Sequence, residues 1–150
     1  AGATNVIPNV VELEGTFRTM NEEWRAKAHK LIQKTCNEIA EGHNASCEIE
    51  IKKGYPFLQN DEELTRVSKN LAIEYLGTDN VEDLPLRMTA DDFASFSQHM
   101  RTCYYRLGIR NESKGIISGV HTPTFDIDEQ ALETGMGLIA WLVYSQLSST

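Results

Sequence analysis

The segment 129–147 is the feature that most limits how this chain can fold. It is predicted to be a helix that is apolar on most of its sides, with the large side chains Leu132, Met136, Leu138, Ile139, Trp141, Leu142 and Val143. A helix of this kind must be covered on more than one face. We therefore expect it to pack between other elements of a layered domain.

The rest of residues 59–150 predicts helices and strands in alternation. In order, these are a helix capped by Asn60 and ended by Gly77, a strand at 86–88, a helix at 91–100 capped by Thr89, a strand at 103–109 and a polar loop at 110–119. The first of these helices has an acidic first turn, as the helix dipole favours. Interleaved strands and helices are typical of an α/β domain.

Residues 1–58 predict a separate strand–helix–strand unit. Apolar and polar side chains alternate over 10–19 and again over 46–52, which predicts two strands. Between them, helical spacing predicts a helix that begins at a capping box opened by Thr19, packs one face on a sheet and ends at Gly42. Pro56 interrupts the pattern, so we expect a boundary near Leu58 and a two-lobed chain.

Composition excludes several kinds of partner. The formal net charge is -8, which disfavours binding to nucleic acid or to an anionic membrane. No apolar run approaches the roughly 20 residues that span a bilayer. We expect a cytoplasmic protein, since no signal peptide is visible and the three widely spaced cysteines suit reduced thiols.

His121 is the residue that most suggests chemistry. It lies in a loop between Gly119, which is expected to make a sharp turn, and Pro123, which is expected to hold that turn rigid. A loop histidine at the start of a helix can serve as a metal ligand or as an acid–base group. The alternative is a surface histidine in an ordinary turn.

Three motifs occur in order along the chain. They are Gly2-Ala3-Thr4-Asn5-Val6-Ile7-Pro8 with Glu14-Gly15-Thr16-Phe17-Arg18; Met88-Thr89-Ala90-Asp91-Asp92-Phe93-Ala94 with Tyr104-Tyr105-Arg106-Leu107-Gly108; and Gly119-Val120-His121-Thr122-Pro123 with Phe125-Asp126 and Glu129-Gln130-Ala131-Leu132. Together they resemble the metal-dependent amidohydrolases that include aminoacylases, glutamate-releasing carboxypeptidases and N-acyl amino acid (hippurate-type) amidohydrolases. Asp91 departs from the Glu-Asp-Phe that is usual in the family.

The resemblance implies a fold class and an incomplete enzyme. It implies α/β architecture, with an α+β lid piece at 1–58 and the C-terminal part of a phosphorylase/hydrolase-like catalytic domain at 59–150. The glutamate base and most metal ligands are then expected before residue 1, so the chain holds no catalytic residue of its own and should be inactive alone. The expected partners are the N-terminal half of the enzyme and a second copy, bound through the lid as a homodimer.

The resemblance also implies roles for five residues. His121 would be the last ligand of a site for two divalent ions, zinc or manganese. Asn5 and Arg18 would bind substrate from the lid, and Thr89 and Asp91 would line the cleft. The alternatives are a turn asparagine, a solvated arginine and a helix cap at Thr89.

The implied function is hydrolysis of the amide bond of an N-acyl amino acid or small peptide by metal-activated water. Two alternatives remain: a non-catalytic small-molecule-binding or dimerisation module, and a degenerate relative with a dead metal site. The other histidines, His29, His43 and His99, have no ligand partner at a metal-binding interval.

Overall fold

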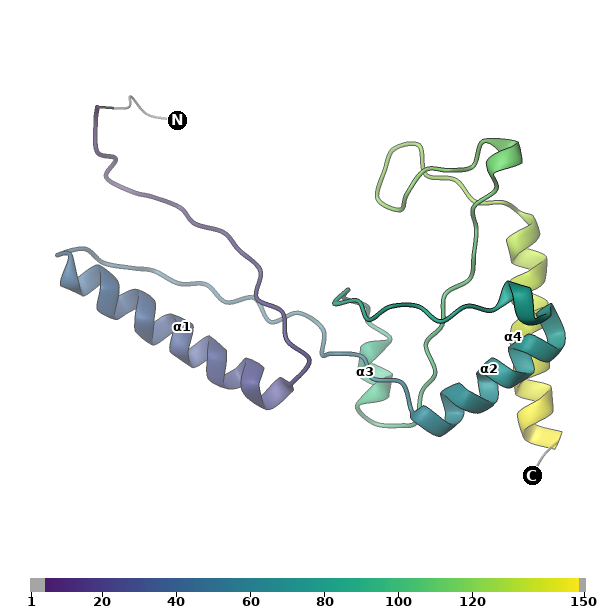
Figure 1. Ribbon diagram of the computed structural model, residues 1–150. Helices are drawn as coiled ribbons and strands as arrows, with labels where there is room; N and C mark the ends of the chain where they lie inside the picture. Colours follow the sequence, from purple (N-terminus) through teal and green to yellow (C-terminus); the bar gives the residue numbers. More distant parts are fainter. Residues whose placement is uncertain (1–4, 149–150) are drawn as a thin grey trace. The chain divides into compact units, whose positions relative to one another are not determined.

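The computed structural model describes residues 5–148 of a chain that divides into two units, Ala1–Phe57 and Leu58–Thr150. Its helices are α1 (Glu22–Gly42), α2 (Glu62–Leu76), α3 (Ala94–Ser97) and α4 (Gln130–Ser148), with two short 3₁₀ helices, η1 (Thr78–Asn80) and η2 (Glu112–Lys114) (Figure 1). The first three residues of the first motif, Gly2-Ala3-Thr4, lie outside the described residues.

Helix α1 of the first unit begins where its sequence offers the better cap. The Asn21 side chain accepts a hydrogen bond from the backbone N–H of Trp24 at 2.8 Å, and two glutamates follow in the first turn. The predicted cap at Thr19 is therefore wrong by two residues. The Thr19 hydroxyl accepts instead from the N–H of Asn21 at 3.3 Å, in keeping with the stronger capping preference of asparagine. The predicted end at Gly42 is confirmed.

Two residues of the first turn tie α1 to the end of its own unit. Arg25 is buried, and its Nη1 donates to the carbonyl oxygen of Tyr55 at 2.7 Å. Glu22, which pairs with Arg25 at 2.5 Å, accepts from the N–H of Phe57 at 3.1 Å. These contacts join the first turn of α1 to the backbone at Tyr55 and Phe57.

The predicted strands of the first unit do not form ladders within the described residues. The segments 10–19 and 46–52 run without regular pairing, so the strand–helix–strand prediction is wrong here. The apolar side of α1, with Trp24, Leu31 and Ile39, is accordingly exposed. Alternation of side chains sets which face of a strand is apolar, but a strand also needs a neighbouring backbone to accept and donate hydrogen bonds.

The second unit is built on α2 and α4, which lie side by side (Figure 1). Leu138 and Leu142 of α4 are buried, the latter 6% exposed. The Trp141 indole N–H donates to the carbonyl of Leu71 on α2 at 3.0 Å, and its ring stacks on Tyr75 with 6.5 Å between centroids. The predicted terminal helix is thus confirmed, within a residue of its predicted bounds.

The expected cover on more than one face of α4 is only partial among the described residues, where Leu107 approaches the helix at Gly135 in addition to the contact with α2. Side chains opposite α2 remain exposed, and Leu147 is 74% exposed. Helix α2 covers one side, while the remaining large apolar side chains, such as Met136 and Tyr144, face solvent. An apolar helix side of this kind is usually covered by another element or by a partner.

Several predicted boundaries of the second unit move by a few residues. Asp61, not Asn60, caps α2, because its carboxylate accepts from the N–H of Leu64 at 2.8 Å. Asn60 instead exchanges two hydrogen bonds with the backbone of Tyr104, at 2.9 and 2.7 Å. The predicted end of α2 at Gly77 is confirmed, with a φ of 87° that favours glycine.

The predicted helix at 91–100 shortens to α3 and is not capped by Thr89. Asp91 accepts from the N–H of Phe93 at 2.9 Å and so begins the turn that leads into α3. The segments 86–88 and 103–109 form no ladder in the part of the chain described, where the only bridge recorded joins Asn111 and Ile116. The α/β prediction is therefore not confirmed, because the described residues form helices but no strand.

Close packing of α2 on α4 depends on a glycine. A Cβ at Gly137 would lie 1.9 Å from the Tyr75 hydroxyl oxygen and 2.9 Å from its ring carbon. We expect Gly137→Ala to lower the free energy of unfolding by about 1–2 kcal/mol, because overpacking outweighs the gain in helix propensity. Chemical denaturation of the complete protein measures this change.

Gly135→Ala is the matched control. Its Cβ would meet only the flexible end of Leu107, at 2.8 Å, which can rotate away. Alanine there should be neutral or stabilising. Equal effects of the two alanines would show that Tyr75 yields freely and that the helix contact is loose.

Candidate functional site

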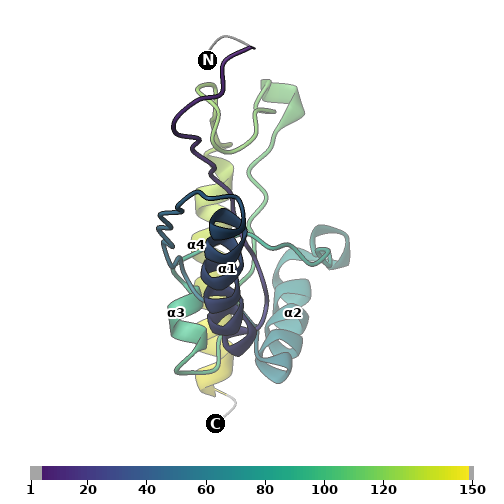
Figure 2. The ribbon, with the colours of Figure 1, turned by 90° about the vertical axis from the view of Figure 1, so that its left-hand side faces the viewer.

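The loop 117–127 carries His121 and lies beyond the N-terminal end of α4 (Figures 1 and 2). His121 is exposed and has a φ of 65°, in the left-handed region. Gly119, which was expected to make a sharp turn, does not have a positive φ, and the left-handed conformation is taken by the histidine itself. Histidine is one of the few non-glycine residue types enriched there.

Hydrogen bonds within the loop hold this turn. The Thr122 hydroxyl donates to the carbonyl of Gly119 at 2.8 Å, and the N–H of Phe125 donates to the carbonyl of Thr122 at 3.1 Å. The hydroxyls of Ser118 and Thr124 meet across the loop at 2.9 Å. A left-handed residue costs about 1–2 kcal/mol and persists where its surroundings determine it.

The ring of His121 is not engaged by any hydrogen bond or ion pair within residues 5–148. An exposed imidazole of this kind can direct one ring nitrogen toward a metal ion and the other toward a supporting hydrogen-bond acceptor. The loop thus carries an exposed imidazole on a turn that is held by its own hydrogen bonds.

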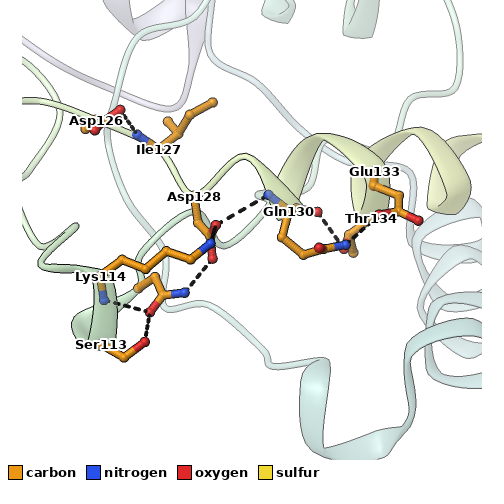
Figure 3. Close-up of polar contacts among 9 residues, drawn as sticks. Ser113, Lys114, Asp126, Ile127, Asp128, Gln130, Glu133 and Thr134 are labelled. Carbon is orange, nitrogen blue, oxygen red and sulfur yellow. Dashed lines mark hydrogen bonds and ion pairs between the residues drawn. The ribbon is translucent and has the colours of Figure 1, made fainter.

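The base of the same loop is closed by Asp128, just before α4. Its two carboxylate oxygens accept from the Asn111 amide and from the Lys114 ammonium, each at 2.6 Å (Figure 3). The Asn111 hydrogen bond, followed by that of Lys114, holds the pKa of the Asp128 carboxyl below its usual value. The carboxylate therefore stays charged to a lower pH than that of an unpaired aspartate.

Asp91 and Thr89 contact the segment 104–106. Asp91 accepts from the Tyr104 hydroxyl at 2.9 Å, and this hydrogen bond raises the pKa of Tyr104. The Thr89 hydroxyl accepts a long hydrogen bond from Arg106, at 3.4 Å. Thr89 is exposed and Asp91 is half-buried. The structure therefore places both residues in a polar cluster of the second unit.

Asn5 and Arg18 lie in the first unit, and both are exposed. Arg18 is in the segment preceding α1, which carries no ladder among the described residues. The two remaining site residues predicted for the lid are thus on a different unit from His121, Thr89 and Asp91.

A hollow of about 660 Å³ lies beside the first turn of α2 and is lined by residues that include His99 and Arg101. Only some of its polar groups are paired, and the buried Thr102 hydroxyl in its lining has no hydrogen-bond partner among the described residues. Asp61 accepts from Arg101 at 2.9 Å as well as capping α2, and the Arg101 hydrogen bond lowers the pKa of Asp61. The residue that caps α2 in this hollow, Asp61, is therefore already hydrogen-bonded.

The sequence profile of peptidase family M20/M25/M40 matches residues 2–145. The chain belongs to this family. The resemblance to metal-dependent aminoacylases and amidohydrolases is thereby confirmed. No solved structure matches the chain significantly.

Several curated proteins are similar to this chain in sequence. Thermostable carboxypeptidase 2 of Saccharolobus solfataricus is 33% identical over 87% of the chain and 33% of its own length. An IAA-amino acid hydrolase, ILR1-like 4, of Arabidopsis thaliana is 27% identical over 93% of the chain and 32% of its own length. An uncharacterized hydrolase of Sinorhizobium fredii, y4tI, is 34% identical over 87% of the chain and 32% of its own length. The M20 chain spans about a third of the length of the relatives it matches.

M20 peptidases generally depend on divalent metal ions, so the donor set matters. His121 fits the part of one ligand, because its ring is exposed and unengaged. No group of three or more His, Cys, Asp or Glu side chains that could hold a metal gathers among residues 5–148. The described part of the M20 chain can supply a ligand but does not form a metal site by itself.

The cluster at Asp128 was not predicted from the sequence. Asn111 and Lys114 lie in the segment expected to be a polar loop, and no contact was predicted for Asp128. A signal was available in Gly115, which follows Lys114 and has a φ of 74°. A glycine at the end of a short polar run predicts a tight turn, and such a turn can direct its side chains back onto a neighbouring element.

None of the helices in the described part of the chain combines the length and apolar character needed to cross a membrane.

Proposed function

We propose that this M20 chain forms the C-terminal part of a metal-dependent hydrolase that cleaves the amide bond of an N-acyl amino acid or small peptide. The observation that carries the proposal is the family match along residues 2–145, which includes His121 and its loop. Relatives named as a carboxypeptidase and as an IAA-amino acid hydrolase support this substrate class.

In this proposal His121 is one ligand of a site for two divalent ions, zinc or manganese. Its exposed ring and left-handed backbone support the role, since a residue in a costly conformation suggests a function for its side chain. A bound metal of this kind would polarise the amide carbonyl and lower the pKa of a water molecule. The loop contributes the direction of the imidazole, through the hydrogen bonds at Thr122 and between Ser118 and Thr124.

The remaining residues are proposed to hold the substrate. The guanidinium of Arg18 can bind a carboxylate through two parallel hydrogen bonds, and the Asn5 amide can donate to a carbonyl oxygen. Thr89 and Asp91 are proposed to line the cleft. Asp91 already accepts two hydrogen bonds, from Phe93 and Tyr104, but a carboxylate has further lone pairs for a substrate donor.

The proposal includes two macromolecular partners and a cytoplasmic location. One partner is the N-terminal half of the enzyme, with the glutamate base and the other ligands. The second is another copy of the protein, bound through the lid. The exposed apolar side of α1 (Trp24, Leu31 and Ile39) supports such a contact, because apolar patches of this kind are often covered in an assembly.

A non-catalytic binding or dimerisation module is the second candidate. The observation in its favour is that residues 5–148 contain no metal-binding cluster. The two candidates differ in what the complete protein does with metal.

Chelation of the complete protein tests the proposed function. We expect it to hydrolyse a panel of N-acyl amino acids and dipeptides, to lose this activity on dialysis against a chelator, and to regain it with zinc or manganese. Release of the amino acid is the measured quantity. A protein that binds these substrates in calorimetry but releases no product, with or without metal, would support the binding module instead.

A further inference from the structure

The loop of His121 is closed at its base by three side chains, which we call the Asp128 clasp: Asn111, Lys114 and Asp128. The Asp128 backbone N–H donates to the carbonyl of Ile109 at 2.9 Å. Its carboxylate accepts from Asn111 and Lys114, each at 2.6 Å. The contacts of Asp128 with Asn111 and Lys114 therefore join the two ends of a loop, and His121 lies in that loop.

A tight turn directs the Asp128 clasp. The Asn111 side-chain oxygen accepts from the Ser113 hydroxyl at 2.7 Å and from the N–H of Lys114 at 3.3 Å. The backbones of Asn111 and Ile116 exchange two hydrogen bonds, each 2.9 Å. Asn111 thus uses its oxygen to shape the turn and its nitrogen to hold Asp128. The turn places the Lys114 ammonium on the same carboxylate (Figure 3).

The carboxylate of Asp128 serves the loop more than the helix. Its contact with the N–H of Gln130, at the start of α4, is 3.4 Å, near the limit for a hydrogen bond. Its contacts with Asn111 and Lys114 are both 2.6 Å. The Asp128 side chain is also only 14% exposed, so its ion pair is less screened than a fully solvated one. Helix capping alone does not account for this geometry.

The Asp128 clasp and two further contacts hold the two sides of the loop together at successive positions from its base to its tip. Nearer to His121, the Ser118 and Thr124 hydroxyls join the two sides of the loop at 2.9 Å. At the tip, Thr122 donates to Gly119 at 2.8 Å. A single hydrogen bond between two hydroxyls holds a loop of this length only weakly. The left-handed turn at His121 persists only while the surrounding contacts determine it. The charged clasp is the strongest closure in this series.

We infer that the Asp128 clasp is a positioning device that sets where His121 presents its imidazole. This inference rests on the proposed role of His121 as a metal ligand. Asn111, Lys114 and Asp128 act through the loop backbone, and none of them is proposed to touch the metal or the substrate. Supporting residues of this kind typically change metal affinity by about 10–100-fold when they are removed.

Two substitutions in the complete protein test the clasp. Lys114→Met removes the ammonium but keeps the apolar stem of an exposed side chain, and Asp128→Asn removes the charge but keeps a good capping residue. We expect each to accelerate amide hydrogen exchange over 117–127 by about tenfold or more. We also expect a weaker apparent affinity for zinc by about 10–100-fold, with turnover restored by excess zinc.

Lys69→Met is the matched control. Lys69 and Asp83 form an ion pair of the same residue types and the same sequence separation of 14 residues, with contacts of 2.7 and 2.6 Å. The control should leave both the exchange of 117–127 and the zinc affinity unchanged. A merely structural role would lower the free energy of unfolding and accelerate exchange across the whole second unit, and excess zinc could reverse that loss as well. Exchange that accelerates over 117–127 alone, with an unchanged free energy of unfolding, is therefore the result that identifies a positioning role.

The outcomes separate this inference from the proposed function. If His121→Asn loses zinc but the two clasp variants keep native exchange and native zinc affinity, the clasp inference is overturned and the proposed function stands. Faster exchange with unchanged zinc affinity also overturns it. If His121→Asn keeps all its zinc, the ligand role fails, and unchanged exchange over 117–127 in the clasp variants would overturn the clasp as well.

Discussion

Replacement of His121 by asparagine in the complete protein is expected to remove one metal ion and nearly all amide hydrolysis. Asparagine accepts the left-handed backbone found at this position, so the turn should survive while the imidazole is lost. Loss of a metal ligand should lower turnover by at least about a thousandfold, or about 4 kcal/mol in the activation barrier. Metal analysis and initial rates measure the two effects on the same sample.

The other histidines are the controls for His121. His29 lies within α1, His43 at its C-terminal cap and His99 after α3. None of them belongs to a metal-binding group among the described residues. His29→Ala, His43→Ala and His99→Ala should keep native metal content and rate. If His121→Asn also keeps native metal content and rate, His121 is an ordinary turn residue and not a metal ligand.

The second large effect is expected at Arg18. If its guanidinium binds the substrate carboxylate, Arg18→Lys should lower kcat/KM by tens-fold, because a lost bidentate charge pair costs on the order of 2 kcal/mol. A substrate whose carboxylate is esterified or amidated should be poor for the native enzyme and far less sensitive to the substitution. Rates on free and blocked substrates give this comparison.

Arg66→Lys is the matched control for Arg18→Lys. Arg66 is an exposed arginine of α2 that pairs with Glu63 at 2.7 Å, and it has no proposed role in binding. It should leave kcat/KM unchanged on both substrates. Equal losses on free and blocked substrates in Arg18→Lys would remove the carboxylate role.

The helices of this chain were largely predictable from its sequence. Apolar spacing and local caps define them, and both are properties of neighbouring residues. The last helix and the ends at Gly42 and Gly77 were predicted correctly. The caps moved by one or two residues, to Asn21 and Asp61, because a second polar residue close to each predicted cap makes the capping hydrogen bond instead.

The strands were predicted from alternation alone, and that information is incomplete. Residues 10–19 and 46–52 have a period-two pattern but no ladder among the described residues. A strand is completed by a partner that can lie anywhere in the fold, so its local pattern does not establish it. The same holds for α4. Its sequence shows that the helix is apolar on most sides, but it does not show which element covers each side.

The candidate site divides in the same way. His121 was singled out from its flanking residues and from the family motif, but its own left-handed φ was not predicted. The Asp128 clasp was missed because it joins residues 111, 114 and 128, and a contact across a loop of that length leaves no periodic trace in the sequence. Long-range polar contacts are the part of a site that local patterns describe least.

The central claim is that His121 binds a catalytic metal, and anomalous diffraction from crystals of the complete protein grown with zinc tests it most directly. We expect an anomalous peak about 2.0–2.1 Å from one imidazole nitrogen of His121, the usual zinc–histidine distance, with the loop still in its left-handed turn. A zinc peak bound wholly by other residues, with the His121 ring directed into solvent, would contradict the claim.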